Sequence, residues 1–248
     1  MKKGFLAFHQ GWTDIINCLP LIDYYLEYYD ELKVFAKAEA RELFLYYIRN
    51  KPPVSLIHHE NEKDDLIKNP EYKRLFHGFF DGGRDDSFVG AFHKSNEHFV
   101  KRFYTSYNID YETRVKYFCL DRDVELEEKM FQDFTSKYGK DYILVHDTAH
   151  ERPINICKTN KHINIGSTTS NFFSMIKVLE NAKEIHVIDS VWGSLCYLLD
   201  CKYGLFKHIP VKIYPFLAEG TERSGGCLKT KYEKVLEPFH PANWEIVI

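Results

Sequence analysis

The fold is decided by residues 4–20, which read GFLAFHQGWTDIINCLP. Their first five residues form an apolar run that predicts a strand, and apolar residues then recur at helical spacing from Ile15 to Leu26. The predicted turn between strand and helix contains Gly11, and Thr13 is the predicted N-cap. Asp14 is then expected in the first helical turn, where the helix dipole stabilises a carboxylate. In an open α/β sheet, such a turn borders the crevice in which ligands bind.

The next segments predict a parallel sheet. Residues 32–36 and 54–58 are short apolar stretches, and between them lies a helical pattern over residues 40–50 that two prolines end. This order of strands and helices is half of a doubly wound α/β domain. Residues 61–87 are charged and contain glycines, so they predict an exposed excursion of loops and short helices with little core.

A second α/β domain is predicted from about residue 139. Helical spacing covers residues 91–104 and 125–138, and residues 139–141 are the predicted linker. The chain is therefore expected to divide into domains 1–138 and 139–248. Strands are predicted at 142–145, 154–156, 163–165, 184–188, 211–214 and 244–248, and helices at 171–181, 194–201 and 232–236.

Composition narrows the class of protein. A formal net charge of −3, with the basic residues spread along the chain, gives no electrostatic footprint for nucleic acid. The apolar run near the N-terminus is too short for a signal peptide or a membrane span, so no transmembrane segment is expected. The six cysteines form no Cys-x-x-Cys pair, which favours reduced thiols in a cytoplasmic protein.

Residues 4–20 resemble the opening of GT-B glycosyltransferases of the lipopolysaccharide heptosyltransferase kind, in which a strand, a Gly-x-x-Asp-like turn and a helix carrying Leu-Pro begin the acceptor domain. The resemblance implies that Asp14 is the general base. A stabilised helix start, without catalysis, is the alternative role for this residue. The acceptor-side candidates at the strand ends are His9, Gln10, Gly11, Trp12 and His58; a partly buried, hydrogen-bonded histidine is the alternative for His9 and His58.

Residues 166–190 contain a hydroxyl-rich turn, a helix ending in Asn-Ala, a strand and an Asp-Ser exit. They are similar to the nucleotide-sugar half of heptosyltransferases and fucosyltransferase-type GT-B enzymes, in which the next loop holds the diphosphate. Backbone N–H groups behind a small glycine suit a phosphate. The donor-side candidates implied here are Ser167, Thr168, Asp189, Ser190, Trp192, Gly193 and Ser194. A plain strand end followed by an N-cap is the alternative for the Asp-Ser pair.

Residues 142–152 form a third polar cluster, in which a predicted strand leads into a loop with two histidines, an aspartate and an arginine. Arg152 could neutralise a leaving diphosphate, and His146 or His150 could donate to the same oxygens. A metal site built from His146, Asp147 and His150 is the rival interpretation. Its spacing matches no zinc pattern, so no metal is expected. Polar residues on an exposed loop are the third possibility.

These patterns and the resemblance together predict a compact GT-B fold, with two Rossmann-like domains facing a cleft. The first would bind a glycan, glycolipid or glycoprotein acceptor, and the second a nucleotide sugar. The expected reaction is an inverting, metal-independent transfer of a hexosyl, deoxyhexosyl or pentosyl group without a cofactor. The alternatives are a nucleotide-sugar epimerase or hydrolase, and a non-catalytic nucleotide- or carbohydrate-binding protein. The sequence lacks the dinucleotide-binding, Walker, zinc-protease and serine-hydrolase motifs, which disfavours those enzyme classes.

Overall fold

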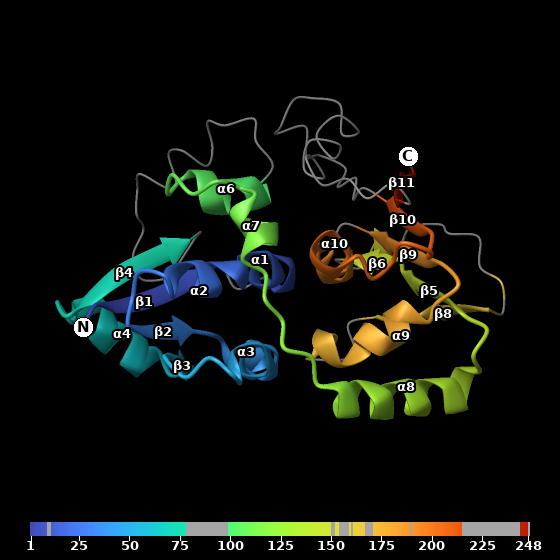
Figure 1. Ribbon diagram of the computed structural model, residues 1–248, viewed down its shortest axis with the longest axis horizontal. Helices are drawn as coiled ribbons and strands as arrows, with labels where there is room; N and C mark the ends of the chain where they lie inside the picture. Colours follow the sequence, from blue (N-terminus) through green and yellow to red (C-terminus); the bar gives the residue numbers. More distant parts are fainter. Residues whose placement is uncertain are drawn as a thin grey trace. The chain divides into compact units, whose positions relative to one another are not determined.

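The computed structural model describes residues 1–8, 11–77, 99–149, 152–153, 159, 161–166, 171–188, 190–214 and 244–247. The chain divides into two compact units, Met1–Asp121 and Arg122–Ile248. Each unit is built on a parallel sheet with helices around it (Figure 1). The predicted fold class, two Rossmann-like α/β units, is confirmed.

The first unit contains a four-stranded sheet in the order β3-β2-β1-β4, and all neighbouring strands are parallel. The strands are β1 (Lys3–Phe8), β2 (Glu31–Phe35), β3 (Val54–Ile57) and β4 (Tyr72–His77). The helical segments are α1 (Trp12–Cys18), α2 (Pro20–Tyr25), η1 (Ala38–Ala40), α3 (Arg41–Ile48), α4 (Glu60–Lys68), α6 (Phe99–Thr105) and α7 (Thr113–Lys116). Pro20 separates α1 from α2, because proline has no N–H with which to continue the helical ladder.

The prediction of an excursion with little core over residues 61–87 was wrong for the part that the structure describes. The helix α4 contributes Leu66 to the core, and β4 pairs with β1 along its whole length. Phe76 of β4 packs edge-on against Phe5, with ring centroids 5.7 Å apart. Lys73 and Arg74 interrupt the apolar pattern of this segment, so the strand is not recognised from the sequence. The structure accommodates these charges because β4 is an edge strand. Residues 78–87 lie outside the described residues.

The second unit contains a five-stranded sheet in the order β11-β10-β9-β5-β8, again with parallel neighbours. The strands are β5 (Ile143–His146), β8 (His162–Asn164), β9 (Ile185–Ile188), β10 (Val211–Tyr214) and β11 (Trp244–Ile246), beside a short antiparallel pair, β6 (Thr148–Ala149) and β7 (Arg152–Pro153). The helical segments are α8 (Val124–Tyr138), η2 (Phe172–Met175), α9 (Ile176–Glu180) and α10 (Val191–Tyr203). The strand predicted at 154–156 and the helix predicted at 232–236 lie outside the described residues.

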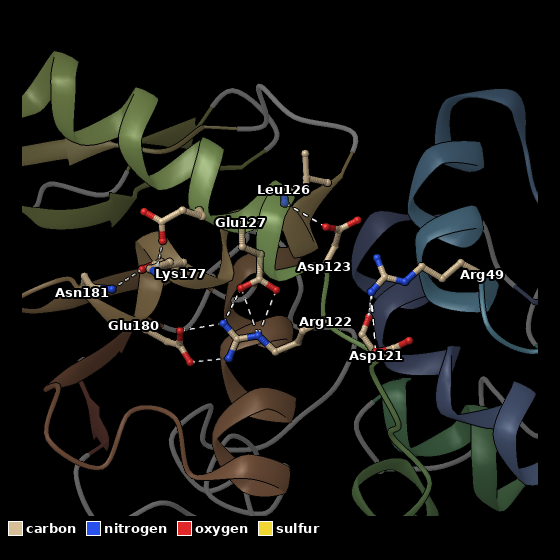
Figure 2. A network of polar contacts seen from close by, with 10 residues as sticks. Arg49, Asp121, Arg122, Asp123, Leu126, Glu127, Lys177, Glu180 and Asn181 are labelled. Carbon is tan, nitrogen blue, oxygen red and sulfur yellow. Dashed lines mark hydrogen bonds and ion pairs between the residues drawn. The ribbon is translucent and has the colours of Figure 1, made fainter.

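Helix α8 lies in the second compact unit, Arg122–Ile248, and the predicted boundary at residues 139–141 stays a prediction. Figure 2 shows an arginine held between two glutamates just before this helix. Arg122 Nε lies 3.0 Å from Glu127 Oε1, and Arg122 Nη1 lies 2.7 Å from Glu180 Oε1 on α9. Asp123 caps α8 by accepting the N–H of Leu126 at 3.0 Å. Charged side chains, rather than a long apolar seam, therefore fix the start of this helix.

Two further expectations concern the cysteines and membrane-spanning segments. The described cysteines Cys18, Cys119, Cys196 and Cys201 are free thiols, while Cys157 and Cys227 lie outside the described residues. Among the helices that the structure describes, none combines the length and the apolar character needed to cross a membrane.

Candidate functional site

In each sheet, the first strand of the unit has later strands on both of its sides, so the direction in which strands are added reverses beside it. In the first unit the chain leaves β1 towards β2 and β3, and then returns on the other side of β1 as β4. In the second unit β5 lies between β8 and β9 in the same way. Ligands of open parallel sheets bind at the carboxyl ends of the strands that flank such a reversal. The candidate sites are therefore the carboxyl ends of β1 and β5.

Asp14 lies just after the carboxyl end of β1, in the first turn of α1. Its residue is 8% exposed, and neighbouring Gly11 and Trp12 are half-buried. The predicted N-cap was wrong: Gly11 caps α1, and Thr13 lies inside the helix, where its carbonyl accepts the Asn17 Nδ2 group at 2.8 Å. His9 and Gln10 lie outside the described residues. The predicted placement of Asp14 in the first turn is confirmed.

One helical turn beyond Asp14, Asn17 forms a buried polar centre. Its Oδ1 accepts Arg114 Nη1 at 2.8 Å, and its backbone carbonyl accepts the Tyr104 hydroxyl at 2.5 Å. Arg114 is 4% exposed. Burial raises the pKa of the adjacent Cys18 thiol, the charge of Asp14 raises it further, and the charge of Arg114 opposes both. A buried cation thus supports α1 close behind the candidate base. No sequence pattern distinguished the buried Arg114 from the surface arginines.

His58 lies at the carboxyl end of β3 and is half-buried, with its ring centroid 4.2 Å from that of His59. Strand β2 separates β3 from β1. Since neighbouring strands are about 4.8 Å apart, His58 stands at the correct edge of the sheet but roughly 10 Å from the reversal.

His146 and Ser190 meet at the reversal of the second unit. His146 ends β5, and Ser190 is the N-cap of α10 after β9. Ser190 Oγ lies 2.9 Å from His146 Nδ1, and both residues are buried. The Ser190 side chain makes no capping hydrogen bond, so its partner is the histidine rather than the helix. Burial lowers the pKa of His146 to about 4, against the opposing charge of Asp147, and the imidazole is neutral at neutral pH.

Hydrogen bonds join the other loops at this edge. Asp147 Oδ1 accepts Asn164 Nδ2 at 2.6 Å, and Asn164 Oδ1 accepts the N–H of Gly166 at 2.8 Å. The carbonyl of Gly166 in turn accepts Trp192 Nε1 at 2.8 Å. The loops after β5 and β8 are thereby tied to the first turn of α10. Asn164 and Gly166 were not predicted as site residues; their signal was only their position at the end of a predicted strand.

The start of α10 presents backbone groups rather than side chains. Trp192 is fully buried and packs edge-on against Phe172, with ring centroids 5.0 Å apart. A Cβ on Gly193 would stand 2.8 Å from the carbonyl oxygen of Ile188, so glycine permits the close approach of helix to strand. The N–H of Ser194 makes the first helical bond, to the carbonyl of Ser190 at 2.9 Å. The three preceding N–H groups have no acceptor within the helix, an arrangement suited to an anion.

The remaining donor-side candidates are only partly placed. Arg152 lies in β7 of the short antiparallel pair that follows β5. His150, Ser167, Thr168 and Asp189 lie outside the described residues. Among the residues that are described, no three histidine, cysteine or acidic side chains are grouped to hold a metal ion. The rival metal site depends on His150, so it is not tested.

This architecture is similar to that of solved glycosyltransferase structures. No protein-family model and no curated protein sequence matches the chain. Among solved structures it is similar to a glycosyl transferase family 9 protein from Veillonella parvula DSM 2008, with a TM-score of 0.55 and 8% identity over 99% of this chain and 87% of that protein. It is also similar to TibC, an iron-containing dodecameric glycosyltransferase from enterotoxigenic E. coli H10407, with a TM-score of 0.51 and 12% identity over 86% of this chain and 58% of that protein.

A weaker likeness is to the E. coli heptosyltransferase WaaC with ADP-2-deoxy-2-fluoro heptose, with a TM-score of 0.42 and 10% identity over 94% of this chain and 98% of that protein. The fold assignment rests on the first two structures, and the fucosyltransferase part of the resemblance stays a prediction. The chain has the two-unit α/β fold of glycosyltransferases, as the resemblance of residues 4–20 and 166–190 implied.

Proposed function

We propose that the chain is a glycosyltransferase that moves a sugar from a nucleotide-sugar donor to a hydroxyl acceptor. One observation carries the proposal: in a fold shared with glycosyltransferases, each sheet places functional groups at the carboxyl ends where its strand order reverses. The first unit offers a carboxylate there, Asp14, and the second offers an anion site at the start of α10.

The donor diphosphate binds at α10 in this proposal. The N–H groups of Val191, Trp192 and Gly193 point along the helix axis, where the dipole favours negative charge. Neutral His146 and the Ser190 hydroxyl add hydrogen bonds without adding charge, and Arg152 supplies a cation from the neighbouring loop. Negative charge grows on the diphosphate as the sugar leaves, so donors fixed at this position stabilise the transition state more than the ground state.

The acceptor binds at the first unit. Asp14 removes the proton from the acceptor hydroxyl, whose oxygen forms a bond to the anomeric carbon while the bond to the diphosphate breaks. A direct displacement of this kind inverts the anomeric carbon, and it requires no metal or other cofactor. Arg114 acts through Asn17 as a positioning residue for the turn that carries Asp14. Gly11, Trp12 and His58 are the proposed acceptor-side neighbours.

The first experiment identifies the donor. A thermal-shift screen of nucleoside diphosphates finds selective ligands, because a ligand that binds the native state raises its melting temperature by mass action. Sugar transfer is then measured for wild type, Asp14→Asn and a control, Asp64→Asn, which changes an exposed carboxylate on α4. Asp14→Asn should lower kcat by about two to four orders of magnitude while the Kd for the nucleoside diphosphate stays unchanged. Wild-type turnover in Asp14→Asn would refute the proposed base.

Incubation with the nucleotide sugar alone separates the other enzyme classes. An epimerase or hydrolase converts the donor without an acceptor, whereas a transferase leaves it largely intact until an acceptor is added. Selective binding without turnover across a broad panel of donors and acceptors would indicate a non-catalytic binding protein.

A further inference from the structure

A basic hollow of about 1020 Å³ lies at the amino-terminal side of the first sheet, around the edge strand β4. Five cationic side chains and one carboxylate line it: Lys2, Lys3, Lys68, Lys73, Arg74 and Glu71. The chain as a whole has a formal net charge of −3, so this positive charge is a local concentration rather than a general property. Figure 1 shows β4 at the edge of its sheet.

Glu71, the carboxylate that lines the hollow, already forms an ion pair. Lys3 Nζ lies 2.9 Å from Glu71 Oε2. The other four cationic side chains are exposed, and no ion pair of their side-chain nitrogens is found among the described residues. The backbone N–H of Lys2 donates to Asp30 Oδ2 at 2.6 Å. Positive side chains therefore outnumber carboxylates around the hollow, and a bound anion would be attracted to them.

Tyr72 gives the hollow a fixed aromatic wall. The Nζ atoms of Lys3 and Lys33 lie 5.5 Å and 5.4 Å from the centre of its ring. Its hydroxyl donates to Glu31 Oε1 at 2.5 Å, which holds the ring in place. Tyr29 and Tyr107 also line the hollow. Lysine and arginine side chains are donors to phosphate oxygens.

The basic end of the hollow lies away from the candidate catalytic edge. Lys3 and Tyr72 are the first residues of β1 and β4 and are paired in register. The six residues of β1 span roughly 17 Å before the chain turns towards Asp14. An anion held beside Lys3 and Tyr72 is thus distant from Asp14, although the hollow itself extends along β4 as far as Phe76. Strand addition to β4 is disfavoured, because Lys73 and Arg74 place charge on that edge.

We propose that this hollow is a binding site for a clustered phosphate anion, carried either by a lipid headgroup or by a soluble polyphosphate. Several phosphates are needed because each exposed lysine contributes little alone, whereas four acting on one ligand add up. The volume of about 1020 Å³ accommodates a group of that size. The inference does not depend on the proposed sugar transfer.

Tripolyphosphate is the probe, with binding measured by calorimetry at several salt concentrations. The test variant is Lys73→Glu/Arg74→Glu, and its matched control is Lys140→Glu/Lys207→Glu, which makes the same charge change at exposed lysines of the second unit. The test variant should bind tripolyphosphate about tenfold or more weakly, and the control should bind like wild type. Far-UV circular dichroism and the unfolding midpoint verify that both variants fold.

A third variant, Gly193→Ala, which disturbs the backbone N–H groups at the start of α10, tests for binding there. Equal weakening in test variant and control, or weakening confined to Gly193→Ala, would overturn the proposed site. Co-sedimentation with phosphatidylcholine vesicles, with and without phosphatidic acid, distinguishes the sources. Binding to phosphatidic acid vesicles that Lys73→Glu/Arg74→Glu abolishes indicates a lipid headgroup, and tripolyphosphate binding without vesicle binding indicates a soluble anion. No binding to either probe would refute the proposal.

Discussion

Ser190 Oγ lies 2.9 Å from His146 Nδ1, in a buried contact that links the end of β5 to the start of α10. The contact joins two loops at the point where the strand order of the second sheet reverses. A serine and a neutral histidine can donate hydrogen bonds there without bringing a second buried charge. The pair therefore orders the anion site and leaves the backbone N–H groups of α10 to bind the charge.

The burial of His146 predicts a pH dependence of stability. The pKa of the folded-state imidazole is about 4, below its ordinary value of 6.5. Between these values the unfolded chain binds a proton that the folded chain does not, so stability falls as the pH is lowered through this window. The full effect is up to about 3 kcal/mol of unfolding free energy. Urea unfolding near pH 7 and near pH 4 measures it.

The His146→Gln variant should lose this part of the pH dependence and keep the rest. His208→Gln, at an exposed histidine of the same unit, is the control and should follow wild type. Parallel pH profiles for wild type and His146→Gln would contradict the assignment.

The ion pairs of Arg122 predict that this arginine stabilises the second unit. Arg122→Met removes the guanidinium beside Glu127, a carboxylate that is 1% exposed. Loss of one partner of a buried pair costs about 3–5 kcal/mol, because the remaining charge stays desolvated. Urea unfolding followed by circular dichroism should show a lower midpoint. Arg41→Met, which breaks an exposed pair with Glu42, should change stability by about 0.5 kcal/mol or less.

A second substitution refines this prediction. Arg122→Met/Glu127→Leu removes the half-buried guanidinium together with the buried carboxylate, so it should recover part of the stability that Arg122→Met loses. No recovery would mean that Glu180 or the packing of α8 carries the effect instead.

Gly193 is expected to tolerate no side chain. The Cβ of Gly193→Ala would stand 2.8 Å from the backbone oxygen of Ile188, and no side-chain rotation can relieve that contact. The variant should lose about 1–3 kcal/mol of stability and bind nucleoside diphosphates more weakly, because the start of α10 must shift. Ser194→Ala adds no atom to the same turn and should lose less. Wild-type stability and affinity in Gly193→Ala would contradict the tight helix–strand approach.

Arg114 is expected to stabilise the first unit through its guanidinium and not through its charge alone. Arg114→Lys keeps the charge but loses the 2.8 Å bond to Asn17 Oδ1 and the contact with the Tyr111 ring, whose centre lies 4.4 Å from the guanidinium carbon. The buried amide oxygen then lacks this donor, at a cost of about 1–3 kcal/mol. Thermal unfolding compares it with Arg41→Lys at an exposed site. Equal melting temperatures for the two variants would argue against the role.

The sequence by itself determined the elements whose apolar pattern is local. Strand β9 is buried throughout, and buried apolar residues recur within β2, β3 and β10, so these strands can be recognised without a partner. The placement of Asp14 in the first turn of α1 followed in the same way, from glycine and helical spacing. Strand β4 was missed because an edge strand needs a neighbour, β1, to offset its charged residues.

Only the tertiary structure decided which distant residues meet. Ser190 contacts His146 across 44 positions of sequence, and Arg114 reaches Asn17 across 97. Arg122 likewise pairs with Glu180 of α9, 58 positions along the sequence. Hydrogen bonds and ion pairs of this kind leave no periodic trace in the sequence, because their partners are brought together by the packing of whole elements and not by local spacing.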